Sequence, residues 1–279
     1  MAIEYTDTEL PRENVYGHTK KIILIRAALD VLSRKYGRGL NVLDVGCGNG
    51  SAVTRYLKHI GGDVLGIDLH EPSIRFAQEN YGGKGISFSV SRAEDITVGE
   101  SGFDAIIFAD VLEHVDNPEM LLHNVKKNIN AHGRVFVTIP NGFGPFEIES
   151  LISRIPFLGP LLIKITDIFV AILNKFVFPG RWSEVVKKEY VPYNEESPHI
   201  QFFTLNKFSE LISLCGYTIV CRHNLSFVSG PFTNYIFAPS TNFCRWNVAI
   251  AGKLPGWLTS AWFFELKLCD KETAESIPE

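Results

Sequence analysis

Several features that would define other protein classes are scarce in this sequence. Net charge is only −4, so a general nucleic-acid-binding surface is not expected. No apolar run reaches the roughly 20 uncharged residues that a membrane-spanning helix needs, because the longest apolar region, 151–178, is interrupted by charged residues. The polar, acidic start "MAIEYTDTEL" is not typical of a secretory signal.

Cysteine is also sparse, and the chain contains no CxxC pair. An odd number of scattered thiols argues against a disulfide framework or a zinc site and fits a reducing compartment such as the cytoplasm. The five positions are Cys47, Cys215, Cys221, Cys244 and Cys269.

What the sequence does contain is a regular alternation of short apolar segments with segments of helical periodicity between residues 41 and 140. Such alternation predicts right-handed crossovers and a parallel sheet. The expected strands are 41–45, 63–69, 86–91, 103–110 and 134–140. The expected helices are 14–36, 51–60, 71–81 and 117–129.

The alternation stops after Pro140 and resumes near residue 204 with a capped helix, followed by strands at 217–224 and 261–268. We interpret 1–279 as a single domain with four parts. They are an N-terminal helical cap (1–37), a cofactor-binding core (38–141), an insertion or lid (142–198), and the C-terminal part of the sheet with the acceptor side (199–270).

A glycine-rich corner, "VLDVGCGNG" at 42–50, joins the first expected strand to the following helix. Glycine permits positive φ and close approach of a ligand, but the spacing differs from the G-x-G-x-x-G of dinucleotide-binding folds. Asp44 lies two residues before Gly46, where a carboxylate would repel phosphate and favour an amino group. Asp68 ends the second strand, where it can accept ribose hydroxyls. The pattern indicates a nucleoside with a cationic amino-acid tail, which is S-adenosylmethionine.

With these residues the chain resembles the class I S-adenosylmethionine-dependent methyltransferases. The matching motifs are "VLDVGCGNG", "VLGIDL", "FDAIIFADVLEHVDNP" and "GRVFVTIPN". The resemblance implies an α/β fold, a Rossmann-like doubly wound seven-stranded sheet that is parallel except for one antiparallel edge strand, with a helical insertion after strand 5.

The resemblance also implies roles for individual residues in cofactor binding. Asp44 would hold the amino group of the methionine moiety, directly or through water, and Asp68 the ribose. The backbone at Gly46, Cys47 and Gly48 would approach the cofactor, Leu69 would pack on adenine, Ala93 or Glu94 would contact the adenine amino group, and Asp110 would line the site. Arg92 stands where the family often has an acidic residue.

Catalytic candidates lie in "ADVLEHVDNP" and "SPHIQFF". His114, with Glu113 beside it, is a candidate base for a hydroxyl acceptor because an imidazole titrates near neutral pH. His199 is a candidate for the acceptor pocket, or alternatively has a capping or packing role. Alternatively, Glu113 and His114 only satisfy backbone groups. The stretch is also similar to ubiquinone-biosynthesis O-methyltransferases, which implies a second option: Asp110, Glu113 and His114 gathering a hard divalent cation.

The insertion contains an apolar helical segment with one narrow polar stripe, "LLIKITDIFVAILNKF". Such a helix is either a lid or lies in a membrane interface, so 151–178 is a candidate for peripheral membrane contact. The aromatic and basic residues downstream, Arg181, Trp182, Tyr190 and Tyr193, are candidates for framing an acceptor.

We therefore predict O-methylation of a small-molecule, glycan, lipid-linked or quinone-type acceptor. No "NPPY"-like stretch follows the fourth strand, which weighs against methylation of amino groups on bases or glutamine. Two alternatives stay open at this point: an NAD-dependent oxidoreductase with a Rossmann-like domain, and a catalytically silent binding module of the methyltransferase fold.

Overall fold

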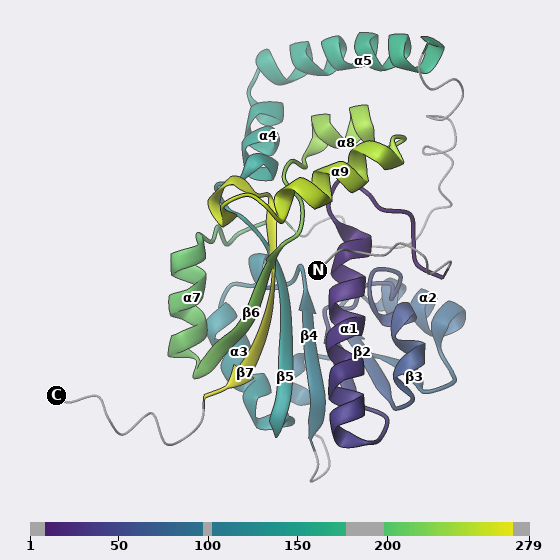
Figure 1. Ribbon diagram of the computed structural model, residues 1–279, viewed down its shortest axis with the longest axis vertical. Helices are drawn as coiled ribbons and strands as arrows, with labels where there is room; N and C mark the ends of the chain where they lie inside the picture. The colour runs from purple at the N-terminus through teal and green to yellow at the C-terminus, as the bar shows by residue number, and fades with distance from the viewer. Residues whose placement is uncertain (1–8, 97–101, 177–197, 270–279) are drawn as a thin grey trace, which may run out of the picture.

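The computed structural model describes residues 9–96, 102–176 and 198–269, and its centre is a seven-stranded sheet of order β3-β2-β1-β4-β5-β7-β6 (Figure 1). Five parallel strands come from the region where apolar and helical segments alternate. The strands are β1 (Val42–Val45), β2 (Val64–Asp68), β3 (Ile86–Val90), β4 (Phe103–Ala109), β5 (Ile129–Pro140), β6 (Tyr217–Asn224) and β7 (Ala261–Leu268).

The one antiparallel strand that the resemblance predicted is β7. It pairs with both β5 and β6 and therefore lies one position inside the edge, while β6 forms the edge itself. Because β7 is antiparallel to both of its neighbours, β5 and β6 run in the same direction. The seven-stranded Rossmann-like α/β fold is confirmed.

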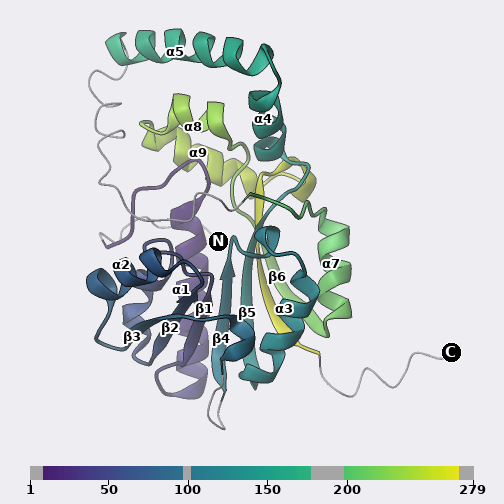
Figure 2. The ribbon, with the colours of Figure 1, turned by 180° about the vertical axis from the view of Figure 1, so that it is seen from behind.

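Helices cover both faces of the sheet (Figures 1 and 2). On one face α1 packs through Ile25 and Leu29, and on the other α3 and α7 pack through residues such as Leu122 and Phe208. The helices before the insertion are α1 (His18–Tyr36), α2 (Glu71–Tyr81) and α3 (Pro118–Val125), with 3-10 turns at Thr54–Ile60, Ala93–Asp95, Leu112–His114 and Lys126–Asn128. Those after it are α7 (Leu205–Leu214), α8 (Pro231–Phe237) and α9 (Thr241–Ala251), with a 3-10 turn at Gly256–Leu258.

Local signals in the sequence explain where several helices begin. The Asn117 side chain accepts a hydrogen bond from the Met120 N–H at 2.8 Å, as expected of an N-cap. Thr204 does the same for Lys207 at 3.2 Å. The expected helix at 51–60 forms as a 3-10 helix from Thr54 to Ile60 instead.

The predicted helical insertion after β5 is present as α4 (Pro145–Arg154) and α5 (Leu158–Phe176). The axes of α4 and α5 are bent by 108°, and α5 lies across α8, above the carboxyl ends of the parallel strands (Figure 1). Within the described ranges no single helix is long and apolar enough to cross a membrane, although α4 and α5 together meet the length and composition. The candidates Arg181, Trp182, Tyr190 and Tyr193 lie outside the described residues.

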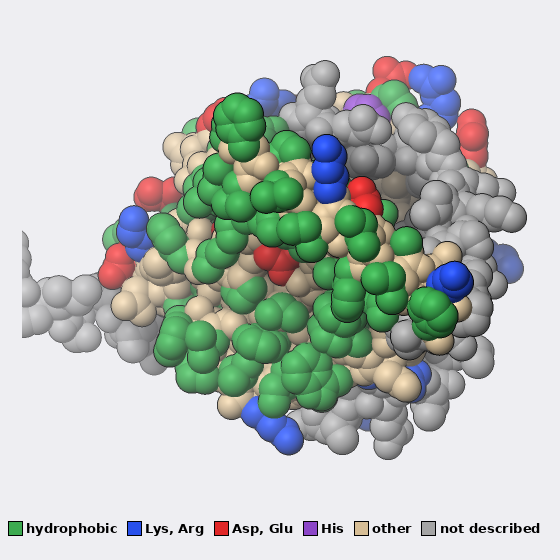
Figure 3. All heavy atoms as spheres, turned by 90° about the horizontal axis from the view of Figure 1, so that it is seen from above, with side chains coloured by type: hydrophobic (Ala, Val, Ile, Leu, Met, Phe, Trp, Pro, Cys, Tyr) green, Lys and Arg blue, Asp and Glu red, His purple; other side chains and the backbone are tan. Residues whose placement is uncertain are grey.

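The outer face of the insertion is unusually apolar (Figure 3). The side chain of Phe157 is 91% exposed and that of Phe176 72%. Further exposed apolar side chains on α4 and α5 are Ile148, Leu151, Leu161, Ile163, Ile165, Ile168, Phe169 and Ile172. We call this set, with Phe157 and Phe176, the apolar platform.

Candidate active site

The glycine corner forms a tight loop between β1 and the first 3-10 helix. Gly46 has φ 67°, and a Cβ there would lie 2.7 Å from the Val111 side chain, so only glycine fits. Gly48 has φ 55°, but a Cβ on it would meet no atom within 4 Å. The backbone at Gly48 therefore borders open space, as expected where a ligand approaches the chain.

Asp68 lies at the carboxyl end of β2 and is held by this loop. Its carboxylate accepts hydrogen bonds from the Gly48 N–H at 2.9 Å and from the His70 N–H at 2.8 Å. The neighbouring Leu69 is 68% exposed. A carboxylate at a strand end beside an exposed apolar side chain suits a ribose with its adenine, but both contacts stay predictions.

Asp44 is almost completely buried behind the loop, with 1% of the residue exposed. Its carboxylate accepts a hydrogen bond from the Thr54 hydroxyl at 2.6 Å. Burial raises its pKa to about 7, although the Thr54 hydrogen bond and the nearby Lys21 oppose the shift. This depth fits the water-mediated form of the predicted contact with the cofactor amino group better than a direct one.

The 3-10 turn Ala93–Asp95 contains the two residues that are expected to contact the adenine amino group. Ala93 is buried, whereas Glu94 is bonded to the neighbouring Arg92, with Nε to Oε1 at 2.6 Å. Arg92, which stands where the family often has an acidic residue, thus forms an ion pair with the carboxylate of Glu94. Recognition of the adenine amino group by Glu94 would require this pair to separate.

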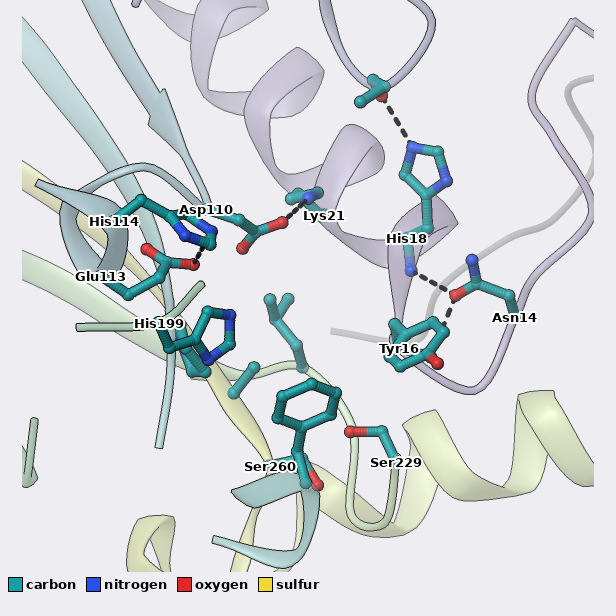
Figure 4. Close-up of a pocket in the computed structure, with 15 residues that line it drawn as sticks. Asn14, Tyr16, His18, Lys21, Asp110, Glu113, His114, His199, Ser229 and Ser260 are labelled. Atoms are coloured by element: carbon teal, nitrogen blue, oxygen red, sulfur yellow. Dashed lines mark hydrogen bonds and ion pairs between the residues drawn. The ribbon is translucent and has the colours of Figure 1, made fainter. Parts of the chain in front are cut away.

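Asp110 has a different role from the metal ligand that the resemblance suggested. It adopts φ 59°, and its carboxylate pairs with Lys21 of α1 and accepts a hydrogen bond from Thr138 at 2.7 Å (Figure 4). The surrounding protein desolvates Asp110 and acts to raise its pKa, but 46% of the side chain is exposed. Lys21 and the hydrogen bonds outweigh this effect, and the pKa of Asp110 is lowered. The predicted metal set Asp110, Glu113 and His114 is therefore not assembled.

The physical reason is the path of the chain after β4. A regular helical turn would align residues 110, 113 and 114 on one side. Instead Asp110 is left-handed and the turn that follows is a 3-10 helix from Leu112 to His114. The side chain of Asp110 points to Lys21, away from His114 (Figure 4).

Glu113, His114 and His199 do come together, as the catalytic candidates of the sequence. Their ligand atoms lie within 4.8 Å of one another, and the two imidazole rings are 4.9 Å apart at their centroids. Burial and the nearby Asp110 raise the pKa of Glu113 well above its usual range. We refer to these three residues as the histidine–glutamate cluster.

The cluster lines a cavity of about 470 Å³ at the carboxyl ends of the parallel strands (Figure 4), the location where ligands bind in open α/β sheets. Asp110 also lines this cavity, and its predicted contact with the cofactor stays a prediction. Sequence reasoning missed several lining residues: Asn14, Tyr16, His18, Lys21, Phe146 and Ser229. His18 also contacts the segment that follows the glycine corner, with Nε2 2.7 Å from the Ala52 carbonyl oxygen.

Two residues that sequence reasoning missed matter for charge: Lys21, which lines the cavity, and Glu147, which contacts the lining residue His199. Lys21 carries the cation nearest to Asp110 and is only 9% exposed at its side chain. Glu147, in the first turn of α4, pairs with His199, Oε1 to Nδ1 at 2.6 Å. A lysine inside the apolar pattern of the first helix was the available signal for Lys21. Nothing in the local sequence indicates that Glu147 reaches His199.

Comparison with known proteins places the chain in a family. A family model described as "Methyltransferase domain" matches residues 18–222. The mitochondrial ubiquinone biosynthesis O-methyltransferase of Rattus norvegicus is 34% identical over 110 residues, covering 37% of this chain and 31% of that protein. The ubiquinone biosynthesis O-methyltransferase of Sinorhizobium medicae is 30% identical over 114 residues, covering 40% of this chain and 46% of that protein.

Solved structures give the same fold at lower identity. The plantazolicin methyltransferase BpumL, solved with S-adenosylhomocysteine, aligns with TM-score 0.52 and 15% identity over 90% of this chain and 85% of that chain. The chain belongs to the methyltransferase-domain family, and the prediction of an S-adenosylmethionine-dependent methyltransferase is confirmed. The curated relatives are matched over less than half of their own length.

Proposed function

We propose that this methyltransferase transfers the methyl group of S-adenosylmethionine to a hydroxyl oxygen of a quinone-type phenol that carries a lipid tail. The observation that carries the proposal is the histidine–glutamate cluster, which borders the same cavity as Lys21 and Asp110 beside the glycine corner. The partial likeness to two ubiquinone biosynthesis O-methyltransferases supports a phenolic acceptor over a glycan.

The residues around the glycine corner suit different parts of the cofactor. Asp68 and Leu69 would hold the adenosine moiety, and the backbone of the glycine corner would border the methionine moiety. Lys21, which also pairs with Asp110, would attract the cofactor carboxylate, and Asp44 its amino group. Because Lys21 and the histidine–glutamate cluster line the same cavity, the acceptor would bind there, beside the methyl donor.

Methyl transfer is an in-line displacement in which the sulfur–methyl bond breaks as the oxygen–methyl bond forms. A phenol attacks efficiently only after it loses its proton. The Nδ1 atoms of His114 and His199 face the Pro198 carbonyl oxygen at 3.0 Å and Glu147 Oε1 at 2.6 Å. Since these oxygens accept, each Nδ1 carries the hydrogen, and Nε2 is the basic nitrogen of the neutral ring. His114 is the base we propose, with His199 beside it.

We further propose that the apolar platform lies in a membrane interface, from which a lipid-tailed acceptor reaches the cavity. Large contiguous apolar patches on a protein surface often mark sites of contact with a membrane or a partner. The exposed cations Arg154, Lys164 and Lys175 lie on the same two helices and suit anionic headgroups. Phe146 and Glu147, which belong to α4, lie next to the cavity residue His199, so the platform and the cavity share one helix.

A transfer assay with the isotope-labelled methyl donor tests the acceptor class. We expect label to appear in phenols with a prenyl tail presented in vesicles, and to be absent when the phenolic hydroxyl is already methylated. Label in glycan or tail-less small-molecule fractions, with none in the prenylated phenols, would contradict the proposal. A location in the cytoplasm at a membrane surface stays a prediction.

A further inference from the structure

The histidine–glutamate cluster combines two imidazoles and one carboxylate that come from separate parts of the chain. Glu113 and His114 belong to the 3-10 turn after β4, and His199 to the segment before α7. The candidate ligand atoms of the three residues lie within 4.8 Å of one another. Two histidines and one carboxylate form a set that divalent transition metals prefer in proteins.

Both imidazoles are already oriented for ligation through Nε2. His114 donates from Nδ1 to the Pro198 carbonyl oxygen, and His199 donates from Nδ1 to Glu147. A hydrogen bond from the second ring nitrogen to a carbonyl or carboxylate is the usual support of a metal-binding histidine, because it fixes the tautomer and the ring orientation.

Glu113 supplies an independent observation. The residue is 1% exposed, and its Oε2 has no hydrogen-bond partner among the described residues. Its other oxygen, Oε1, is 3.9 Å from His114 Nε2. A buried carboxylate oxygen without a partner is costly, and a cation between Glu113 and the two imidazoles would satisfy it.

The backbone holds the two segments firmly together. The N–H groups of Ile200 and Gln201 both donate to the Glu113 carbonyl oxygen, at 2.8 and 3.0 Å. Together with the bond between His114 and Pro198, they fix His199 against the turn although 85 residues separate it from His114. This is the preorganisation that a metal site needs.

We propose that Glu113, His114 and His199 hold one divalent transition-metal ion, with Glu147 orienting His199. The role of the ion rests on the proposed function: as a Lewis acid it would lower the pKa of the acceptor hydroxyl, whose proton then leaves to solvent. In the metal-loaded protein Nε2 of His114 is a ligand, so the ion takes the place of His114 as the group that promotes loss of this proton. Compared with the set expected from the resemblance, His199 takes the place of Asp110. The scarcity of cysteine argued against a zinc site in the sequence, but this set of ligands contains no cysteine.

The exchange of a carboxylate for an imidazole changes the preferred ion. Two imidazoles favour Zn²⁺ or Co²⁺ over Mg²⁺, which prefers oxygen ligands. Lys21 neutralises Asp110, and this removes the second acidic group that a hard cation would require. The structure therefore predicts zinc-like selectivity instead of magnesium dependence.

Calorimetric titration of tag-free, chelator-treated protein with Zn²⁺ tests the site, and Co²⁺ absorption reports the ligands. We expect one Zn²⁺ per chain. Affinity should fall by about 100-fold or more in His199→Ala and Glu113→Gln, and about 10- to 100-fold in Glu147→Gln. Asp110→Asn should keep zinc affinity, as should His132→Ala, a control at the exposed start of β5.

S-adenosylhomocysteine affinity, measured on each variant, shows whether the fold is intact. No stoichiometric zinc binding, or equal affinity in the wild type and His199→Ala, would overturn the inference. Loss in Asp110→Asn with retention in His199→Ala would instead indicate the two-acid arrangement and also overturn it. Methyl transfer by zinc-free protein leaves the proposed function standing, whereas absence of S-adenosylhomocysteine binding removes the proposed function itself.

Discussion

The buried carboxyl of Asp44 should make cofactor binding depend on pH. Its pKa is raised to about 7 by burial in the ligand-free protein. The cofactor ammonium favours the ionised carboxylate, so binding must ionise Asp44 when the pH is below 7. Affinity should therefore fall about tenfold per pH unit below 7, which amounts to about 100-fold, or about 2.7 kcal/mol, at pH 5.

Titration with S-adenosylhomocysteine between pH 5 and 7.5 measures this slope, in a range where the ligand ammonium stays protonated. Asp44→Asn should bind more weakly at pH 7.5 and show little slope. Thr54→Val removes the hydrogen bond that favours the carboxylate, so it should move the inflection to higher pH. An equal slope in wild type and Asp44→Asn would refute the reasoning.

The same shift has a consequence for stability. A carboxyl whose folded-state pKa lies above its unfolded value favours the neutral form in the fold, so its contribution is most favourable at low pH and is lost as pH rises toward 7. Asp44→Asn should raise the Tm of the ligand-free protein at pH 8 but hardly at pH 4. A lower Tm at pH 8 in a correctly folded variant would contradict the assignment.

Three further predictions concern the pocket and the platform. His114→Ala should keep cofactor affinity and lower kcat by about 10²-fold or more; unchanged turnover would reject its role. Lys21→Met should weaken S-adenosylhomocysteine binding by about 10- to 100-fold, because a charged hydrogen bond is lost. Adenosine, which lacks the carboxylate, should bind as before. Equal losses for both ligands would contradict the role of Lys21 as partner of the cofactor carboxylate. The double variant Ile168→Glu, Phe169→Glu should abolish co-sedimentation with anionic vesicles, whereas Val31→Glu, an exposed apolar control on α1, should not; absence of binding by the wild type would remove the membrane proposal.

The parallel core could be predicted because its signals are local. Burial on both faces makes a strand mostly apolar, as in β1 and β4, each of which contains a single aspartate, and the glycine corner requires positive φ at Gly46 and Gly48. Asp68 was found at a strand end by spacing alone. The insertion was recognised because its apolar residues do not fit the alternation before it.

The acceptor side could be predicted only in part, because it depends on contacts distant in sequence. His199 was singled out, but its partner Glu147 is 52 residues away and on another element. Lys21 reaches Asp110 across 89 residues, and this contact, invisible in the spacing of "ADVLEH", decided which acidic residue was available. The left-handed conformation of Asp110 could not be predicted either, because positive φ is expected mainly at glycine.

The most direct test of the account is a crystal structure of the protein with S-adenosylhomocysteine. It should show the ribose hydroxyls on Asp68, the amino-acid end between Asp44 and Lys21, and the sulfur facing the cavity beside His114. A ligand bound in the opposite direction, a dinucleotide in its place, or an empty pocket at saturating concentration would contradict the central claim.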